Sequence, residues 1–209
     1  MLKVGLTGGI ATGKTHVARR LSELGCLVYD ADQIARSVVR PGTTGLAQVV
    51  EEFGQEILTT EGTLDRAKLG SIVFADEARR LRLNQILHPL IVAELDKLIA
   101  EAESLYPGGI CVIDAALMIE TGSYKRYDAL IVVYCSREEQ LARLMKRNSL
   151  NKQEAEARIA AQMPVEEKIK YADYVIDTSG SYEQTRKLVD EIYLKLQLRC
   201  SAKPNVLAT

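Results

Sequence analysis

Hydrophobic residues fall along this chain in two alternating patterns: short continuous runs and longer stretches with helical spacing. Continuous apolar runs are typical of strands buried on both faces of a parallel sheet. Helical stretches between such runs favour an α/β fold with a parallel sheet of five strands flanked by helices. The expected strands are Leu2–Thr7, Cys26–Asp30, Ile110–Asp114, Ala129–Cys135 and Tyr174–Asp177.

Segments with helical periodicity connect these runs. Pro89 lies inside the longest segment and is expected to break it, because proline removes a backbone hydrogen bond. The C-terminal residues, Arg199–Thr209, are expected to form a fraying tail. The expected helices are His16–Leu24, Asp32–Val39, Gly45–Phe53, Asp65–Phe74, Glu77–Tyr106, Arg137–Arg147, Lys152–Gln162, Pro164–Tyr171 and Tyr182–Leu198.

A phosphate-binding pattern, G-x-x-x-x-G-K-T, lies between the first expected strand and the first expected helix. Glycines let successive backbone N–H groups approach phosphate oxygens, and the helix that follows directs its positive end at the same phosphates. The lysine can then bridge the terminal phosphates, and the threonine hydroxyl is placed to ligate Mg²⁺. We therefore expect this loop to bind a nucleoside triphosphate together with Mg²⁺. The expected nucleotide-binding residues are Gly8, Gly9, Ile10, Ala11, Thr12, Gly13, Lys14, Thr15 and His16.

Asp32 follows the second expected strand, and ligands of open α/β sheets bind beyond the carboxyl ends of the strands. A carboxylate there could accept the proton of an attacking hydroxyl during phosphoryl transfer. Alternatively, Asp32 could simply cap the helix that begins beside it. The sequence leaves both interpretations open.

Two further carboxylates follow the third expected strand. Asp114 ends the apolar run Ile110–Ile113, the Walker-B pattern in which the carboxylate holds Mg²⁺ directly or through water. An aspartate at an ordinary strand-to-loop turn is the alternative interpretation. Glu120 closes the same loop and could face the same cleft.

Arg143 and Arg147 are four residues apart, so they project from one face of a predicted helix. Two guanidinium groups on one face suit a phosphoryl group in transit, although a solvated helix face is the commoner outcome. Arg158 and Gln162, again four apart, could flank the adenine or be exposed. His88 could be a metal ligand, a substrate contact or part of a buried kink.

Composition narrows the classes of partner. The chain has 209 residues with a formal net charge of −1 and a hydrophobic fraction of 47%, enough for a substantial core. Balanced charge gives no field for nucleic acid or for an anionic membrane, so neither is an expected partner. The four cysteines are scattered, and three of them lie in apolar runs as small buried residues. We recognise no signal peptide or membrane span, and we expect a cytoplasmic protein.

With these residues assembled, the chain resembles the dephospho-coenzyme A kinase family almost from end to end. Val4–Thr15 is similar to that family's opening G-L-T-G-G-I-x-[ST]-G-K-[ST], and Gly9-Ile10 is more specific than the phosphate loop alone. The other matching segments are Asp30–Arg36, Leu87–Pro89, Gln140–Arg147, Arg158–Met163 and Ala172–Asp177. Two segments depart from the family pattern. Asp114–Glu120 lacks a usual proline and aromatic residue, and Thr178 stands where asparagine is usual.

The resemblance implies ATP-dependent phosphorylation of the ribose 3′-hydroxyl of dephospho-coenzyme A. It implies that Asp32 is the general base and that Arg36 and His88 help to hold the acceptor. Arg143, with Arg147, would approach the phosphates as a lid closes, and Lys14 would neutralise the transferring group. We also expect Glu120 to be one of the residues that bind the acceptor.

By analogy with P-loop kinases, we expect a single domain, 1–209, in three parts. The core covers about 1–38, 107–142 and 172–198, a helical acceptor-binding insertion about 39–106, and a small lid about 143–171. The expected partners are ATP and dephospho-coenzyme A, and the protein should be a monomer or a small homo-oligomer. A nucleoside monophosphate kinase and a nucleotide-switched binding protein of GTPase type are the alternatives.

Overall fold

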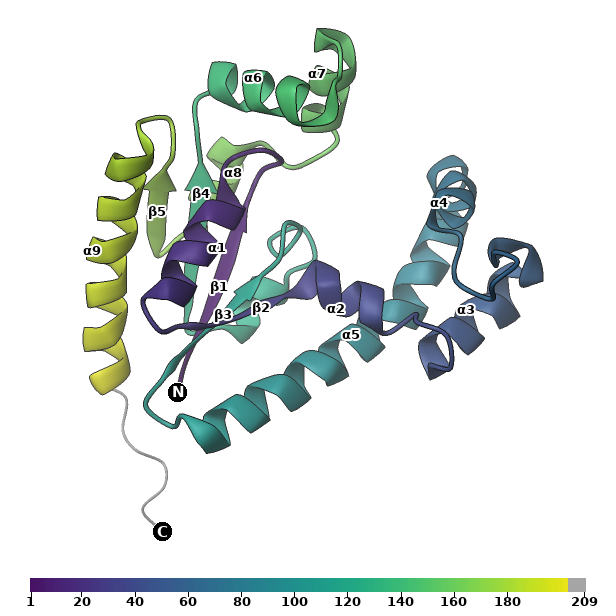
Figure 1. Ribbon diagram of the computed structural model, residues 1–209, viewed down its shortest axis with the longest axis horizontal. Coiled ribbons are helices and arrows are strands. Elements are labelled where there is room, and N and C mark those ends of the chain that lie inside the picture. The colour runs from purple at the N-terminus through teal and green to yellow at the C-terminus, as the bar shows by residue number, and fades with distance from the viewer. Residues whose placement is uncertain (203–209) are drawn as a thin grey trace. The chain divides into compact units, whose positions relative to one another are not determined.

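Five strands pair into one sheet in the order β2-β3-β1-β4-β5 (Figure 1). The computed structural model describes residues 1–202. Pairing is parallel between β1 and β3, β1 and β4, and β4 and β5. The strands are β1 (Leu2–Gly8), β2 (Leu27–Asp30), β3 (Ile110–Asp114), β4 (Ala129–Tyr134) and β5 (Tyr174–Asp177). The predicted fold class, a parallel five-stranded sheet flanked by helices, is confirmed.

Helices connect the strands, as the periodicity predicts. The α-helices are α1 (Lys14–Glu23), α2 (Ala31–Ser37), α3 (Thr44–Phe53), α4 (Arg66–Ala75), α5 (Glu77–Leu105), α6 (Arg137–Asn148), α7 (Lys152–Ala160), α8 (Val165–Ile169) and α9 (Tyr182–Ser201). Two short 3-10 helices, η1 (Gln55–Ile57) and η2 (Ser123–Arg126), lie in the connecting loops.

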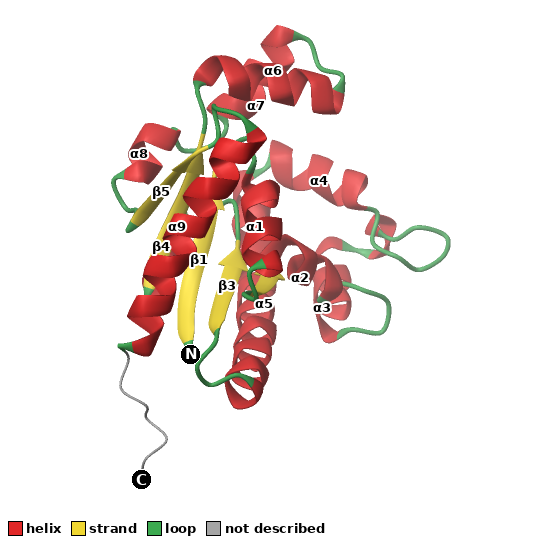
Figure 2. Ribbon diagram, turned by 60° about the vertical axis from the view of Figure 1, so that its left-hand side comes forward, coloured by secondary structure: helices red, strands yellow, loops and turns green. Residues whose placement is uncertain are grey.

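The core of the sheet is built from the continuous apolar runs. β3 is buried along its whole length, and β1 and β4 nearly so, as strands covered on both faces require. On one face, Val17 and Leu21 of α1 and Val189 and Leu196 of α9 pack into the same cluster as the strands. Both helices lie along the strands in Figure 2. Cys26, Cys111 and Cys135 are buried here, as predicted.

The chain divides into two compact units. The first combines residues 1–29 with the described residues from 102 onward and contains the sheet. The second, Asp30–Glu101, is helical and has a hydrophobic cluster of its own around Val49, Phe53 and Ile57. The finer division into core, acceptor-binding insertion and lid stays a prediction.

Two local predictions are wrong. α5 continues through Pro89 without a break, because apolar side chains on both sides of the proline are held by packing. Ile86 and Leu87 pack on the helical cluster, while Leu95 and Ile99 are buried further along the helix. Such packing offsets the hydrogen bond that proline removes.

The predicted tail also begins too early. α9 extends to Ser201, so residues 199–201 are helical. The rest of the predicted tail, from residue 203 to 209, lies outside the described residues. Within residues 1–202, no helix is long and apolar enough to cross a membrane.

Gly8 ends β1 at a point where the backbone of β4 leaves no room for a side chain. A Cβ atom there would collide with the carbonyl oxygen of Val133 and lie 2.9 Å from Thr12 Oγ1. We therefore expect Gly8→Ala to lower the free energy of unfolding by about 1–3 kcal/mol, because the backbone must shift. Urea unfolding measures this change.

Gly108→Ala is the matched control. Among the described residues, nothing lies within 4 Å of a Cβ atom at Gly108. Its effect should stay within about 0.5 kcal/mol. Equal unfolding free energies for wild type and Gly8→Ala would contradict the packing argument.

Candidate active site

The loop between β1 and α1 has the backbone conformation that phosphate binding requires. Ala11 and Gly13 both adopt left-handed conformations, with φ of 60° and 83°. Thr12 is buried and its hydroxyl donates to the Gly9 carbonyl over 2.9 Å, which closes the loop on itself. α1 begins directly at Lys14, so the loop lies at a helix N-terminus. Backbone N–H groups at a helix N-terminus are suited to binding an anion.

Lys14 and Asp114 meet beside this loop. Strand pairing places Asp114, the last residue of β3, opposite Leu6 of β1. The Lys14 ammonium forms an ion pair with the Asp114 carboxylate, and both side chains are largely buried. Thr15, the next residue of α1, has an exposed side chain. The three residues predicted to bind phosphate and Mg²⁺ thus come from the first turn of α1 and from the end of β3, which pairs with β1.

Two glutamines from opposite ends of the α6–α7 segment hold the peptide groups of Ile10. Gln140 Nε2 donates to the Ile10 carbonyl over 2.9 Å, and the Ile10 N–H donates to Gln162 Oε1 over 2.7 Å. We call this pair of contacts the glutamine clamp. The Ile10 N–H is therefore engaged by the protein. The clamp also gives a physical reason for the specificity of Gly9-Ile10, since a Cβ atom at Gly9 would lie 2.9 Å from Gln140 Nε2.

Arg143 of α6 lies against the end of β5. Its guanidinium donates to the Thr178 hydroxyl over 3.0 Å and to the Thr178 carbonyl over 2.7 Å, and it also pairs with Glu139 at 3.1 Å. The Thr178 hydroxyl in turn donates to the Thr12 carbonyl over 2.7 Å. Thr178 thus links Arg143 to the phosphate loop. Arg147 is exposed and donates to the neighbouring Asn148.

His16 faces α9. Its ring lies 3.7 Å from the ring of Tyr182, centroid to centroid, and its Nε2 is buried without a hydrogen-bond partner among the described residues. Burial, reinforced by the charge of Arg19, lowers the pKa of His16 below 6.5. The imidazole is therefore neutral at pH 7. Its predicted contact with the nucleotide stays a prediction.

The carboxylate that caps α2 is Asp30. Asp30 accepts hydrogen bonds from the backbone N–H groups of Asp32 and Gln33, over 2.8 and 3.1 Å. The alternative in which Asp32 is the cap is therefore wrong. Asp32 and Arg36 are both exposed and one turn apart on α2, so their charged groups can face a common ligand.

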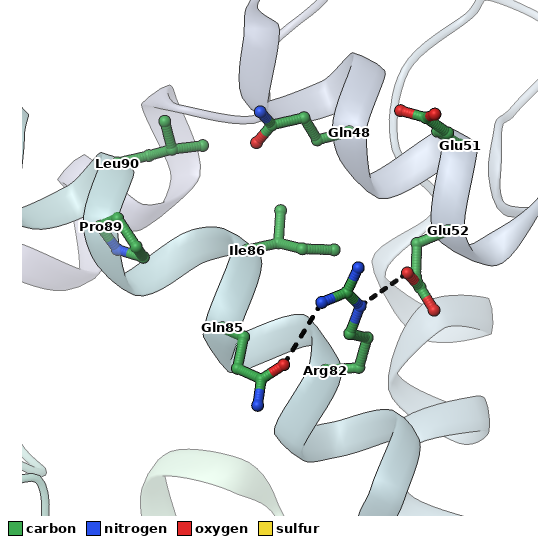
Figure 3. Close-up of a pocket in the computed structure, with 8 residues that line it drawn as sticks. All are labelled: Gln48, Glu51, Glu52, Arg82, Gln85, Ile86, Pro89 and Leu90. Atoms are coloured by element: carbon green, nitrogen blue, oxygen red, sulfur yellow. Dashed lines mark hydrogen bonds and ion pairs between the residues drawn. The ribbon is translucent and has the colours of Figure 1, made fainter.

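His88 lies on α5 next to Pro89 and is exposed, which excludes the buried kink. Pro89 borders a cavity of about 500 Å³ between α3 and α5 (Figure 3). Arg82 projects into it from α5, paired with Glu52 at 2.7 Å and donating to Gln85 over 3.4 Å. Residues 1–202 contain no cluster of three or more His, Cys, Asp or Glu side chains that could hold a metal.

Glu120 is engaged by a residue that sequence analysis missed. Lys168 of α8 is completely buried, and its ammonium lies 2.8 Å from Glu120 Oε1. A single lysine in a predicted helix gives no signal of burial, because lysine is ordinarily exposed. The sequence places Gln140 in a segment that matches the family pattern and Thr178 at a position that departs from it. It does not predict the contacts of either residue with the phosphate loop.

Comparison with known proteins identifies the family. Residues 2–184 match the family model of dephospho-CoA kinase. The chain is 46% identical over 203 residues to the dephospho-CoA kinase of Thermobifida fusca, covering 97% of this chain and 100% of that protein. It is 49% identical over 194 residues to that of Carboxydothermus hydrogenoformans, covering 92% and 93% of the two chains.

Solved structures agree. The dephospho-CoA kinase of Campylobacter jejuni superimposes with a TM-score of 0.72 at 27% identity, over 94% of this chain and 98% of that one. Shikimate kinase from Acinetobacter baumannii, at 20% identity and a TM-score of 0.52 over 97% and 96% of the two chains, shares the P-loop kinase fold. The matches favour neither the nucleoside monophosphate kinase nor the GTPase-type alternative. We conclude that this protein is a kinase and that it belongs to the dephospho-CoA kinase family.

Proposed function

We propose that the protein transfers the terminal phosphoryl group of ATP to the ribose 3′-hydroxyl of dephospho-CoA, giving CoA and ADP. The observation that carries the site assignment is the meeting of Lys14 and Asp114 beside the phosphate loop. In this assignment the backbone of Gly8–Thr15 binds the phosphates. Lys14 neutralises charge on the phosphoryl group as it moves from ATP to the acceptor.

The donor atoms beside the loop fit Mg²⁺. The Thr15 hydroxyl and the Asp114 carboxylate supply hard oxygen ligands, which Mg²⁺ prefers. When bound, Mg²⁺ neutralises charge on the phosphates. Lys14 then parts from Asp114 to reach the terminal phosphate, because one ammonium cannot hold both groups at full strength.

On the acceptor side, we assign the base to Asp32. Asp32 lies two residues beyond the carboxyl end of β2, the edge of a parallel sheet at which ligands bind. Its carboxylate takes the proton of the 3′-hydroxyl as the oxygen attacks phosphorus. We also assign Arg36, His88 and Glu120 to binding of the acceptor. Arg143, joined by Arg147, leaves Glu139 to stabilise the transferring charge.

Closure of the α6–α7 segment would exclude water, since a kinase that leaves ATP exposed hydrolyses it. The glutamine clamp supports this assignment, because it ties both ends of that segment to the phosphate loop. The cytoplasmic location and the monomeric or small oligomeric state expected from the sequence stay predictions.

The test of this function is ATP consumption with and without dephospho-CoA. We expect ADP to appear in step with CoA, and AMP or shikimate to leave the rate at its background. GTP in place of ATP tests the nucleotide preference. Equal ATP consumption with and without dephospho-CoA would contradict the proposal.

Lys14→Ala should abolish transfer. The loss of one positioned charge at a developing oxyanion costs roughly 10²–10³-fold in turnover. Thermal unfolding of the variant must be measured as well, because Asp114 loses its partner. Turnover close to that of wild type in a folded Lys14→Ala protein would remove the phosphate role.

Asp32→Asn should lower turnover by about 10²–10⁴-fold, the usual contribution of a general base, with little change in ATP affinity. Glu191→Gln removes an exposed carboxylate of α9 and serves as the control. Titration with ATP and steady-state kinetics separate the two effects. Near-normal 3′-kinase activity in Asp32→Asn would reject Asp32 as the base.

Asp114→Asn should raise the Mg²⁺ concentration for half-maximal activity by roughly tenfold, as loss of one carboxylate weakens a metal site. Excess EDTA should stop transfer by both proteins. A Mg²⁺ titration curve unchanged by the substitution would reject Asp114 as a ligand of the metal.

A further inference from the structure

Lys168 is the one lysine that is fully buried among the described residues. It lies on α8, the short helix that follows the α6–α7 segment. Removing an ammonium group from water is costly unless other groups replace its hydration. The partners of Lys168 therefore identify what its charge is used for.

Both partners lie in one segment, the loop of residues 115–120 that follows β3. The Lys168 ammonium pairs with Glu120 Oε1 at 2.8 Å and donates to the Ala116 carbonyl over 2.8 Å. The two contacts hold the beginning and the end of this loop. The backbone N–H of Met163 also donates to Glu120 Oε1, over 3.4 Å.

The Ala116 carbonyl has a second donor, the Thr7 hydroxyl of β1, at 3.1 Å. Thr7 immediately precedes the phosphate loop. One carbonyl thus joins β1, the loop of residues 115–120 and α8. Ala115 is held separately, by the hydrogen bond from its N–H to the Leu6 carbonyl over 3.0 Å.

The first four residues of this loop have little stiffness of their own, whereas Ile119 is β-branched and buried. Residues 115–118 are Ala, Ala, Leu and Met, with neither proline nor a β-branched residue to restrict the backbone. Its conformation therefore depends on contacts with other segments. Glu120, which ends the loop, is a proposed acceptor contact, so its position matters for the reaction.

We propose that Lys168 is a positioning residue for the kinase reaction. Its ammonium holds the loop of residues 115–120, and Glu120 with it, in the arrangement that receives the acceptor. It also connects this loop to α8, the helix that follows α7 in the chain. Lys168 does not touch either substrate, because its side chain is sealed from solvent. The inference rests on the proposed function for the acceptor role of the loop.

Lys168→Met tests the proposal, with Lys170→Met as the matched control. Lys170 lies on the same short segment, but its side chain is 66% exposed and pairs only with Glu167 at the surface. Each variant is assayed well below its unfolding temperature. For Lys168→Met we expect KM for dephospho-CoA to rise at least about fivefold and kcat to fall by a similar factor, with KM for ATP within about twofold. Lys170→Met should match wild type.

Hydrogen exchange supplies a readout that is independent of activity. Amides of residues 115–121 should exchange faster in Lys168→Met than in wild type, while those of β1 stay protected. Glu120→Gln removes the ion pair but keeps a side chain of the same length that still carries an oxygen. It should speed exchange in the same segment, and it provides the test if Lys168→Met does not fold.

The outcomes distinguish failure of the positioning role of Lys168 from failure of the proposed kinase function. A lower unfolding temperature in Lys168→Met with unchanged kinetic constants would overturn the positioning role, as would unchanged exchange of residues 115–121 in both variants. If wild type fails to phosphorylate dephospho-CoA while the exchange of this loop still depends on Lys168, the proposed function fails and the structural role of Lys168 stands.

Discussion

The structure depends on holding the glycine-rich loop between β1 and α1 in one conformation. Glycines permit the left-handed turn at Gly13 and the close approach at Gly8, but they leave the unfolded loop many conformations. Side chains from distant parts of the chain offset this entropy. Thr178 holds the Thr12 carbonyl, and the glutamine clamp holds both sides of Ile10. These contacts fix the conformation of the loop.

The charges around the loop follow the same logic. Lys14 pairs with Asp114, Arg143 with Glu139 and Lys168 with Glu120, so three of the cations proposed to act in the reaction or to position its parts have an anionic partner. The first two pairs are exchangeable, because phosphate oxygens are equally good partners for Lys14 and Arg143. In the pair of Lys168 and Glu120, the lysine side chain is closed to solvent. The two cations proposed to move are thus partly accessible to solvent, and the lysine proposed to stay is fully buried.

The sequence predicted what is local and missed what is distant. Ile110–Asp114 and Tyr174–Asp177 match the observed strands residue for residue, because continuous apolar runs bounded by polar residues leave little freedom in placing a strand. Pro89 was misjudged, since tertiary packing outweighs a single lost hydrogen bond. The contacts of Gln140 and Gln162 with Ile10 span 130 and 152 residues of chain, and no periodicity or spacing carries such a pairing. The burial of Lys168 could not be predicted for the same reason, because it depends on contacts with the distant loop of residues 115–120.

The glutamine clamp has a consequence for how the site responds to its medium. Neither partner of the Ile10 peptide groups is ionised, so the clamp has no proton to gain or lose and no net charge for salt to screen. Ion pairs at exposed positions weaken as ionic strength rises, whereas the clamp has no such dependence. The loop between β1 and α1 is thus fastened to the α6–α7 segment by contacts whose strength depends neither on protonation nor on the ionic strength of the medium.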